Sequence, residues 1–574
     1  MKENLEKIRH SLAHLMASAV YELMPEAKFG IGPTIEDGFY YDFELPRTLI
    51  PEDLEIIEKK IKKRIANKID FEGKEILVDE GKKFFEAGKQ PFKVELIEDL
   101  KQDGTKKVTI FKSGDFVDLC SGPHVKNSSE INPKAFKLIS IAGAYWKGDE
   151  KNPMLQRIYG VAFESKKELD KYLKQKEEAK KRDHRVIGKK MDLFSFHKEA
   201  PGMPFWHPNG VIIFDTLVER WRKIQKKFGY SEIRLPDLLD IELWKRSGHY
   251  EHYKDGMFFT KNEGKTLALR PMDCPGAVLY YSENLHSYNE MPIRLNELGT
   301  VYRNEQSGEL HGLMRVQEIT QDDAHIFITE EMIEGEVTEV LKIMEKIYVP
   351  FDMEKGIFLA TRPDNAMGDE KTWEKAEKAL RKALERNKIK YGLKEKDGAF
   401  YGPKIDIHIN DSLGRTWQMG TIQLDFFMPE RFKLKYIDKN GKEKTPVMIH
   451  RALMGSLERF IGILIEHYGG HFPLWLAPEQ ARILPVSDKF NDYGEKIIAE
   501  LQKAGIRTKL DDSNESLGKK IRNAEIEKVP YMLIIGEKEK ESSSVAVREN
   551  QEGDMGIKNV NDLVKGMKKE IKKY

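Results

Sequence analysis

The chain contains little cysteine and no long apolar segment. Its 574 residues include only 2 cysteines, which argues against a disulfide framework and favours a reducing compartment. No apolar run approaches the roughly 20 residues that cross a bilayer. The N-terminal stretch MKENLEKIRHSLAHLM is charged and amphipathic, without the apolar region of a signal peptide. These absences predict a cytoplasmic protein that does not associate with membranes.

The sequence also lacks an excess of charge of either sign. The formal net charge is +1, from 96 basic and 95 acidic residues. Any contact with a nucleic acid must therefore come from local basic patches rather than from a global field. A hydrophobic content of 40% and a charged content of 33% are typical of a globular protein. The length predicts roughly three or four domains.

Changes of pattern along the chain separate four regions. Residues 1–165 mix one helix with short strands, and residues 166–190 form a charged helical stretch. Most of these charges coat a solvated helix in our interpretation, with contact to RNA phosphates as the alternative. Residues 191–475 hold strand-like segments interrupted by Gly and Pro. Residues 476–574 alternate strands with helices, which predicts a small α/β domain with a mostly parallel sheet.

Several segments of the third region alternate polar with apolar residues, as strands with one buried face do. The polar positions are Lys404, Asp406 and His408; Gln321, Asp323 and His325; Thr421, Gln423 and Asp425; and Arg303 with Glu305. Together these strands predict an antiparallel sheet with one apolar and one polar face. A solvated outer face is one interpretation, but such faces favour Lys, Glu and Thr. Gln, Asp, His and Arg need specific partners, so we favour a binding surface.

The segment GSLERFIGILIEHY predicts an amphipathic helix after these strands. Its apolar stripe consists of Leu457, Phe460, Ile461, Leu464 and Tyr468. Arg459 projects on the opposite side, where it could pair with a carboxylate or hold a phosphate, because its planar fork stays charged.

Longer motifs connect these elements with a known enzyme class. YRNE with the loop SGELHGLMR matches motif 2, GSLERF matches motif 3, and FGYSEIRLP with Pro236 matches motif 1. RPMDCPG, TQDDAHIF and VMIHRALMGSLERF follow in that order. With these motifs the chain resembles class II aminoacyl-tRNA synthetases, specifically the threonyl-tRNA synthetase family, from about residue 5 to its end.

The resemblance implies a multidomain α+β fold. It predicts an N-terminal α+β editing domain (1–165), a linker helix (166–190), a class II catalytic domain with an antiparallel sheet flanked by helices (191–475), and a C-terminal α/β anticodon-binding domain (476–574). Motif 1 implies a homodimer. Many bacterial relatives carry a small ubiquitin-like domain before the editing domain, whereas this chain begins directly at the editing helix. We therefore expect a form without that domain, in which aminoacylation and editing both survive.

The resemblance further implies ATP-dependent attachment of L-threonine to tRNA(Thr) through a threonyl-adenylate. Adenylate formation relies mainly on positioning and charge neutralisation. By resemblance, Arg303 holds the α-phosphate and the amino acid carboxylate, Arg459 the γ-phosphate, and Glu305 the adenine amino group. Further implied contacts are Arg315, Gln418, Gln423, Lys404 and Ser456. Magnesium would accompany the phosphates.

A zinc site is the most specific implication of the resemblance. Cys274, His325 and His450 are far apart in sequence, and each has an ordinary interpretation as a buried or turn residue. By resemblance they are zinc ligands, and three protein ligands leave one coordination position open. Threonine fills it with its amino group and hydroxyl, whereas valine lacks the hydroxyl.

The resemblance also assigns neighbours of the zinc site. Asp323 contacts the amino group of threonine, with Gln321 and Tyr401 lining the pocket. His249, in KRSGHY, matches a position implicated in transfer to the tRNA.

Serine carries the same two ligand groups as threonine, so zinc alone cannot exclude it and hydrolytic editing is expected. His10 and His14, spaced i and i+4, lie opposite the apolar stripe of the first helix, as a surface pair. VDLCSGPHV adds Asp118, Cys120 and His124. A metal site is one interpretation. The resemblance instead implies a metal-free site that deacylates seryl-tRNA(Thr), with Lys93 as its candidate lysine.

The last region contributes candidate anticodon readers. Matching IIGEKEKESSSVAVRE to the family pattern selects Glu539 and Arg548, whose side chains suit the base edges of an unstacked loop. The basic run that follows in the family is replaced here by ENQEG, so affinity for the anticodon stem is expected to be distributed differently.

Two rival hypotheses stay open at this point. A serine or proline enzyme would share Arg303 and Arg459 but would not need the three zinc ligands together. A non-catalytic RNA-binding paralogue would be expected to have lost motif arginines that are present here.

Overall fold

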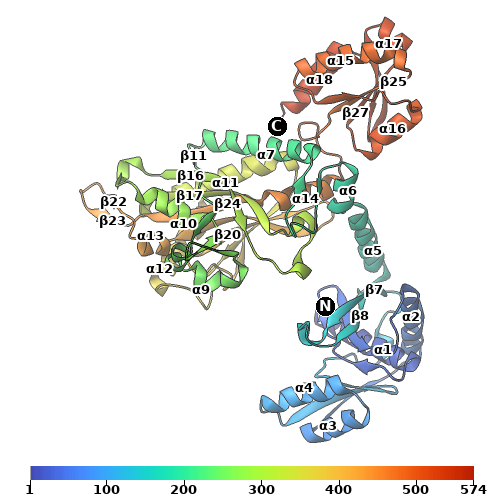
Figure 1. Ribbon diagram of the computed structural model, residues 1–574. Helices are drawn as coiled ribbons and strands as arrows, with labels where there is room; N and C mark the ends of the chain where they lie inside the picture. The colour runs from blue at the N-terminus through green and yellow to red at the C-terminus, as the bar shows by residue number, and fades with distance from the viewer. Residues whose placement is uncertain (1, 574) are drawn as a thin grey trace. The chain divides into compact units, whose positions relative to one another are not determined.

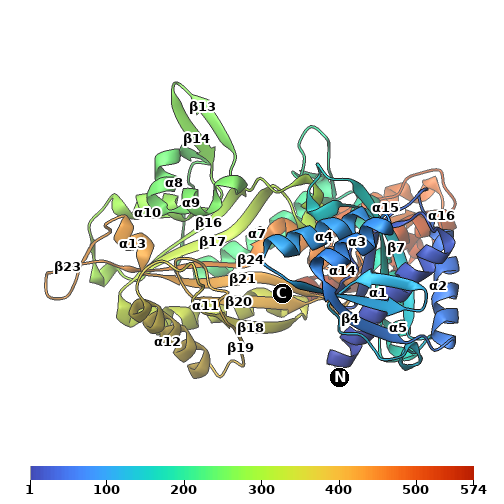
Figure 2. The ribbon, with the colours of Figure 1, turned by 90° about the horizontal axis from the view of Figure 1, so that it is seen from below.

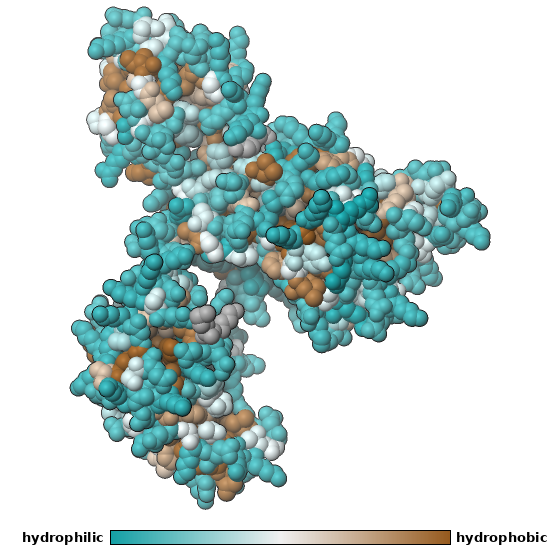
Figure 3. All heavy atoms as spheres, turned by 180° about the vertical axis from the view of Figure 1, so that it is seen from behind, coloured by the Kyte–Doolittle hydropathy of each residue, from teal (hydrophilic) through white to brown (hydrophobic). Residues whose placement is uncertain are grey.

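The computed structural model describes residues 2–573. The chain forms two compact units, one ending at Glu177 and the other starting at Glu178. We call them unit 1 and unit 2 (Figure 1). Within the described residues, no helix is both long and apolar enough to cross a membrane. The face seen in Figure 3 is covered largely by hydrophilic residues, with apolar residues in small groups.

Unit 1 is built around the long helix α1 (Lys2–Leu23). The helix packs on α2 (Pro51–Ala66) and on a sheet. The sheet has the order β1 (Lys28–Phe29), β3 (Gly38–Glu44), β8 (Met154–Ala162), β7 (Phe136–Tyr145), with β2 (Thr34–Ile35) paired to β3. A second sheet, β4 (Phe71–Leu77), β5 (Lys107–Ser113) and β6 (Phe116–Leu119), carries α3 (Val78–Ala87) and α4 (Pro91–Gln102).

The prediction that His10 and His14 form a surface pair is wrong for His14, which is only 2% exposed. Helix α1 buries its apolar stripe in the main core of unit 1, as expected. Its opposite side is covered too, because β5 and β6 pack against it. Tertiary contacts therefore enclose a helix that looks amphipathic in sequence.

The predicted linker helix is broken. Helix α5 (Lys166–Lys181) and helix α6 (His184–Lys190) are separated at Arg182 and Asp183. The Asp183 side chain accepts a hydrogen bond from the Arg185 backbone N–H and so caps α6. Charge patterning alone could not locate this interruption.

Unit 2 contains the predicted antiparallel sheet, in eight strands. Their order is β11 (Ser231–Glu232), β16 (Ile293–Tyr302), β17 (Glu318–Ile328), β24 (Val447–Ser456), β21 (Thr416–Asp425), β20 (Lys404–Asn410), β18 (Glu354–Ala360) and β19 (Gly392–Lys394). The central pairings are antiparallel, and the two edge pairings are parallel.

Helices cover the apolar face of this sheet. They are α7 (Pro208–Lys227), α11 (Ile333–Tyr348), α12 (Glu370–Arg386) and α14 (Leu457–Tyr468), which share one core with the isoleucines of β20. Helices α8 (Ile241–Ser247), α9 (His249–Tyr253) and α10 (Cys274–Ser282) lie on the side opposite α11 and α12 (Figure 2). The polar strand positions therefore face a second layer of the protein and not open solvent.

One strand prediction needs correction. Strand β16 ends at Tyr302, so Arg303 and Glu305 follow the strand and are not part of it. The Arg303 backbone N–H still donates to the Gln317 carbonyl at 2.8 Å. This bond keeps the two sides of the following loop together.

The C-terminal region has the predicted alternation of strands and helices, but its sheet is mixed. The order is β26 (Thr508–Leu510), β25 (Ala481–Pro485), β27 (Tyr531–Ile535), β28 (Ser544–Glu549) and β29 (Gly553–Asn559). Strands β26, β25 and β27 are parallel, whereas β28 and β29 pair antiparallel. The prediction of a mostly parallel sheet is thus wrong for β28, which pairs antiparallel with both β27 and β29. The helices are α15 (Asn491–Lys503), α16 (Leu517–Ile526), α17 (Glu537–Glu541) and α18 (Val560–Ile571).

Candidate active site

Three elements bring Cys274, His325 and His450 together on the polar side of the unit 2 sheet. Cys274 opens α10, and His325 and His450 are register partners on β17 and β24. One ligand atom from each lies within 4.8 Å of the others. All three side chains are buried. We call these residues the Cys274 cluster.

The donor set of the Cys274 cluster fits a metal ion. The Nε2 atom of His325 is buried without a hydrogen-bond partner, which is rare for a buried polar atom in a folded protein. His450 contacts the Asp425 carboxylate through Nε2 at 3.0 Å, an arrangement that orients ligand imidazoles in metal sites. A thiol with two imidazoles is a donor set that zinc accepts, with one position left open.

The electrostatics around the Cys274 cluster also favour a cation. Burial, followed by the charges of Asp323, Asp273 and Asp425, raises the pKa of the Cys274 thiol well above its usual range. Burial raises the pKa of Asp323 to about 7. Several acidic groups therefore share one dry space, and a divalent cation there would offset their mutual repulsion.

The predicted pocket residues lie next to this cluster. Asp323 Oδ2 is 3.6 Å from His325 Nε2, and the Tyr401 ring centroid is 5.4 Å from that of His450. His249 is fully buried, with Nε2 4.0 Å from Cys274 Sγ and Nδ1 2.8 Å from Ser247 Oγ. Gln321 shares β17 with Asp323, two residues before it.

A group of arginines lies beside the loop after β16. Arg459 donates from Nε to the Met314 carbonyl at 2.8 Å. Burial, together with the charges of Arg303 and Arg315, lowers the pKa of Arg459. Arg303 Nε is buried without a hydrogen-bond partner, and Arg315 pairs with Glu305 at 2.8 Å. Such a concentration of guanidinium groups suits phosphate oxygens.

The remaining predicted contacts have defined partners. Lys404 lies 3.2 Å from the fully buried Asp406, which also accepts from Gln418 Nε2 at 2.9 Å. Gln423 is the register partner of Lys404. Ser456 caps α14 by accepting from the Arg459 backbone N–H at 3.2 Å.

Sequence reasoning missed several of these partners. Strand alternation placed Asp406 and Asp425 on the polar face, but not their contacts with Lys404 and His450. Asp273 was missed, although it directly precedes Cys274. Its carboxylate sits so close to Gly299 that a Cβ there would be 2.2 Å from Asp273 Oδ2.

Unit 1 contains a second group of similar side chains, which we call the Cys120 cluster. Its members are His10, His14, Cys120 and His124, whose ligand atoms also lie within 4.8 Å of one another. Cys120 Sγ is 3.2 Å from His10 Nε2 and 3.3 Å from His124 Nε2. Except for His124, these side chains line a cavity of about 810 Å³.

Two further predicted residues join the Cys120 cluster. The Lys93 ammonium is 2.5 Å from Asp118 and 3.0 Å from the Tyr41 hydroxyl. Tyr41 donates to Asp118 at 2.5 Å. Lys93 and Asp118 are both buried, so a complete ion pair lies at the wall of the cavity.

The titratable members of the Cys120 cluster are neutral near pH 7. Burial lowers the pKa of His10, and burial with the charges of His10 and Lys93 lowers that of His14. Burial and the neighbouring imidazoles lower the pKa of His124 to about 2. Burial raises the pKa of the Cys120 thiol to about 11. The cluster therefore offers neutral imidazoles and a thiol to water or a ligand.

The two candidate anticodon residues have partners within their own domain. Glu539, on α17, accepts from the Gly536 backbone N–H at 3.0 Å. Arg548, on β28, lies 3.2 Å from Glu525.

Comparison with family models identifies three parts of the chain. Residues 258–468 match the tRNA synthetase class II core domain (G, H, P, S and T), and residues 480–570 match an anticodon binding domain. Residues 108–159 match the threonyl and alanyl tRNA synthetase second additional domain. The predicted multidomain α+β fold is confirmed.

Full-length relatives agree. The threonine–tRNA ligase of Clostridium tetani (strain Massachusetts / E88) is 51% identical over 570 residues, covering 99% of this chain and 89% of that protein. That of Caldanaerobacter subterraneus subsp. tengcongensis is 51% identical over 562 residues, covering 98% and 87%.

A solved structure gives the same result. The RNA binding domain of threonyl-tRNA synthetase from Cryptosporidium parvum Iowa II has a TM-score of 0.65 and 39% identity, covering 67% of this chain and 98% of that one. Identity at this level over nearly the whole sequence extends well beyond the short motifs. The chain belongs to the threonine–tRNA ligase family of class II aminoacyl-tRNA synthetases.

Proposed function

We propose that this chain attaches L-threonine to tRNA(Thr) with ATP, through a threonyl-adenylate. The observation that carries the proposal is the buried Cys274 cluster beside Asp323, together with the group of arginines formed by Arg303, Arg315 and Arg459. Recognition of an amino acid and neutralisation of phosphates are thereby combined in one region of unit 2.

The Cys274 cluster would hold one zinc ion. Bound zinc, held by only three protein ligands, would be free to coordinate both the amino group and the hydroxyl of threonine. Asp323 then accepts a hydrogen bond from the amino group, and Gln321 and Tyr401 enclose the side chain. Valine has no hydroxyl to offer, so the site rejects it.

Activation proceeds by attack of a threonine carboxylate oxygen on the α-phosphorus of ATP, with release of pyrophosphate. Arg303 holds the α-phosphate and the carboxylate, and Arg459 and Arg315 hold the remaining phosphates. Magnesium would accompany these phosphates. Glu305 accepts from the adenine amino group. Further contacts in the ATP site come from Lys404, Gln418, Gln423 and Ser456.

Transfer of threonine to the 3′-terminal ribose follows. His249, adjacent to Cys274, is the group we assign to this step. Glu539 and Arg548 are our candidates for reading the anticodon, since Arg and Glu side chains match exposed base edges.

Unit 1 would remove serine from mischarged tRNA(Thr). His10, His14, Cys120 and Lys93 line a cavity, and the neutral imidazoles of the two histidines can orient a water molecule there. The buried Lys93–Asp118 pair already places a cation there, which supports a metal-free hydrolytic site.

We also propose that the chain is a homodimer in the cytoplasm, with the segment around Pro236 at the interface. The interface is supported by Leu238, close to Pro236, whose apolar side chain is 42% exposed. The compartment is supported by the two cysteines, which are both free thiols. The domain limits proposed from the sequence complete this assignment: editing 1–165, linker 166–190, catalysis 191–475 and anticodon binding 476–574.

Amino-acid-dependent exchange of pyrophosphate into ATP tests the main assignment. We expect exchange with threonine, weaker exchange with serine, and none with valine or proline. Exchange with proline and no response to threonine would contradict the proposal.

The His10→Ala/His14→Ala protein should keep exchange but fail to clear seryl-tRNA(Thr). Clearance at the wild-type rate would contradict the editing assignment.

A further inference from the structure

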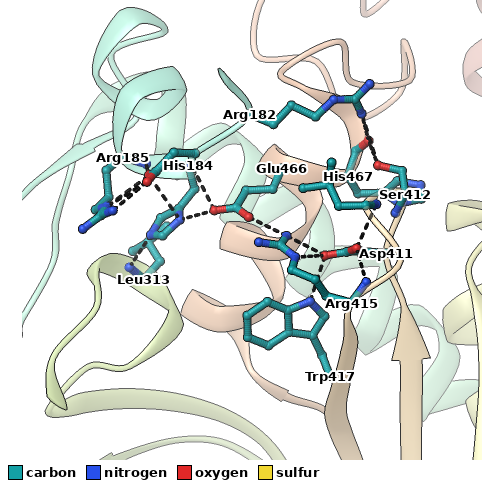
Figure 4. A network of polar contacts seen from close by, with 12 residues as sticks. Arg182, His184, Arg185, Leu313, Asp411, Ser412, Arg415, Trp417, Glu466 and His467 are labelled. Carbon is teal, nitrogen blue, oxygen red and sulfur yellow. Dashed lines mark hydrogen bonds and ion pairs between the residues drawn. The ribbon is translucent and has the colours of Figure 1, made fainter. Parts of the chain in front are cut away.

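A buried histidine near the start of α6 contacts the loop that carries the candidate phosphate ligands. His184 is the first residue of α6 and is fully buried. Its ring lies between the end of α14 and the turn formed by Gly312–Met314 (Figure 4). His184 is not among the predicted site residues, and no step of the proposed chemistry uses it.

Both ring nitrogens of His184 are engaged. Nδ1 lies 2.6 Å from Glu466 Oε1, and Nε2 lies 3.0 Å from the Leu313 backbone N. An amide N–H can only donate, so Nε2 must be the unprotonated acceptor. The proton is therefore on Nδ1, where it is donated to the Glu466 carboxylate. These two bonds fix the tautomer and the orientation of the ring.

Glu466 is itself held by a network of polar contacts. It forms an ion pair with Arg415 at 2.5 Å, and Arg415 pairs with Asp411 (Figure 4). Burial raises the pKa of Glu466, but the bonds from His184 and the charge of Arg415 outweigh it and lower the pKa overall. The acceptor of the His184 proton is thus a fixed carboxylate.

The turn at 312–314 is shaped around the His184 ring. Gly312 has φ +51°, and a Cβ there would lie 2.3 Å from His184 Nε2. Leu313 is fully buried, so its N–H has no access to solvent as an alternative partner. On the next residue of the turn, the Met314 carbonyl accepts from Arg459 Nε at 2.8 Å. Arg315 follows directly.

Asp183, His184 and Glu466 lie close enough to hold a cation. Their donor atoms are already occupied, however. Asp183 Oδ1 accepts from the Arg185 backbone N–H at 2.8 Å, and Asp183 Oδ2 pairs with the Arg185 guanidinium at 2.6 Å. With both His184 nitrogens also bonded, the group is better described as a hydrogen-bonded anchor.

We infer that His184 is a positioning residue for ATP. By accepting the Leu313 N–H, it holds the 312–314 turn so that Arg315 and Arg459 are presented together to the phosphates. This inference rests on the proposed function, because the phosphate roles of both arginines belong to it. A loss of His184 should therefore affect ATP far more than threonine.

Two amide substitutions separate the bonds of His184. Glutamine reaches about as far as Nε2 and can accept the Leu313 N–H. Asparagine reaches only about as far as Nδ1 and can donate to Glu466. Phenylalanine keeps a ring but makes neither bond. His207 is the control for loss of a histidine bonded through both nitrogens, because its Nδ1 lies 2.6 Å from Asp192 and its Nε2 2.9 Å from Ser195. Unlike His184, its side chain is 34% exposed.

The experiment is threonine-dependent pyrophosphate exchange with the full chain, with kcat and the two KM values measured separately. For His184→Phe we expect kcat/KM for ATP to fall about tenfold, with KM for threonine unchanged. His184→Gln should recover most of the loss, His184→Asn should not, and His207→Phe should match the wild type.

The inference is overturned if His184→Phe matches the wild type, or if Asn restores activity as well as Gln. A parallel loss in both KM values with a lowered unfolding temperature would also overturn it, in favour of a merely structural role. Direct ATP binding by calorimetry separates the two levels of the argument. A wild type that binds ATP without activating threonine contradicts the proposed function, and the His184 variants are then decided by ATP affinity.

Discussion

The two Cys/His clusters of this chain have similar donors but opposite surroundings. The Cys120 cluster has a thiol and three imidazoles beside the Lys93 ammonium, which pairs with Asp118. The Cys274 cluster has a thiol and two imidazoles, with the charges of Asp323, Asp273 and Asp425 acting on the thiol. Three members of the Cys120 cluster line a cavity, whereas all three members of the Cys274 cluster are buried.

This difference teaches that neighbours decide what a donor set binds. A buried thiolate among carboxylates is unstable unless a cation is present, so the Cys274 cluster favours a divalent metal. In unit 1 the cation is already supplied by a lysine, and a second one would be repelled. Donor types alone therefore cannot distinguish a metal site from a metal-free hydrolytic site.

The largest expected effect separates the clusters by function. Cys274→Ala removes a proposed metal ligand, so threonine-dependent exchange should fall by more than about 100-fold. Cys120→Ala is the matched control, and it should retain exchange while losing clearance of seryl-tRNA(Thr). Steady-state exchange and deacylation assays on both proteins measure this. Loss of exchange in Cys120→Ala, or its survival in Cys274→Ala, would break the comparison.

A smaller effect should follow from the partner of a single ligand. Asp425 contacts His450 at 3.0 Å, and Asp425→Asn weakens that orientation and removes one charge. We expect zinc affinity to fall by about 10- to 100-fold, as measured by competition with a chromophoric chelator. An unchanged affinity would show that Asp425 does not support the metal.

Lys93→Met tests the electrostatic difference directly. Without the ammonium, Asp118 is left as an unpaired buried carboxylate, and the Cys120 cluster should gain affinity for zinc. We expect zinc content to rise from about one toward about two per chain, with loss of deacylation. Lys93→Arg preserves the charge, so its zinc content should remain at about one per chain. Equal zinc content in the Met and Arg proteins would disprove the role of the lysine.

The smallest effect concerns pH. His124 titrates near its ordinary value when unfolded and at about 2 when folded, so the unfolded chain binds more protons below about pH 6.5. The contribution of neutral His124 to the free energy of unfolding is fully present above that pH and is lost as the pH falls toward 2. His124 alone should lower the free energy of unfolding, measured by urea denaturation, by up to about 1.4 kcal/mol per pH unit. The free energy of unfolding of His124→Phe should fall less steeply with pH than that of the wild type. An equal slope in the two proteins would contradict the role of His124.

Local pattern predicted much of the sheet and part of the site. Strand alternation placed His325 beside Asp323 and Gln321, because a period of two is visible within one segment. It could not place Cys274 or His450, since strand register and the start of α10 depend on long-range packing. Those two ligands, and Lys93, came from the family resemblance.

The features that the sequence pattern missed arise from contacts that a hydrophobic or charge period does not show. The burial of His14 depends on β5 and β6, which are distant in sequence from α1. The break at Asp183 depends on one capping side chain, and the contact of His184 with Leu313 joins residues 129 positions apart. The burial of His14 and the contact of His184 require the tertiary structure, whereas the cap at Asp183 is a local contact with the Arg185 backbone N–H that charge periodicity does not report.

Zinc stoichiometry by elemental analysis tests the central claim most directly. The wild type and Cys120→Ala should each contain about one zinc per chain, and Cys274→Ala should contain close to none. A wild type that is fully active without zinc, or zinc that is lost with Cys120 and retained without Cys274, would contradict the account.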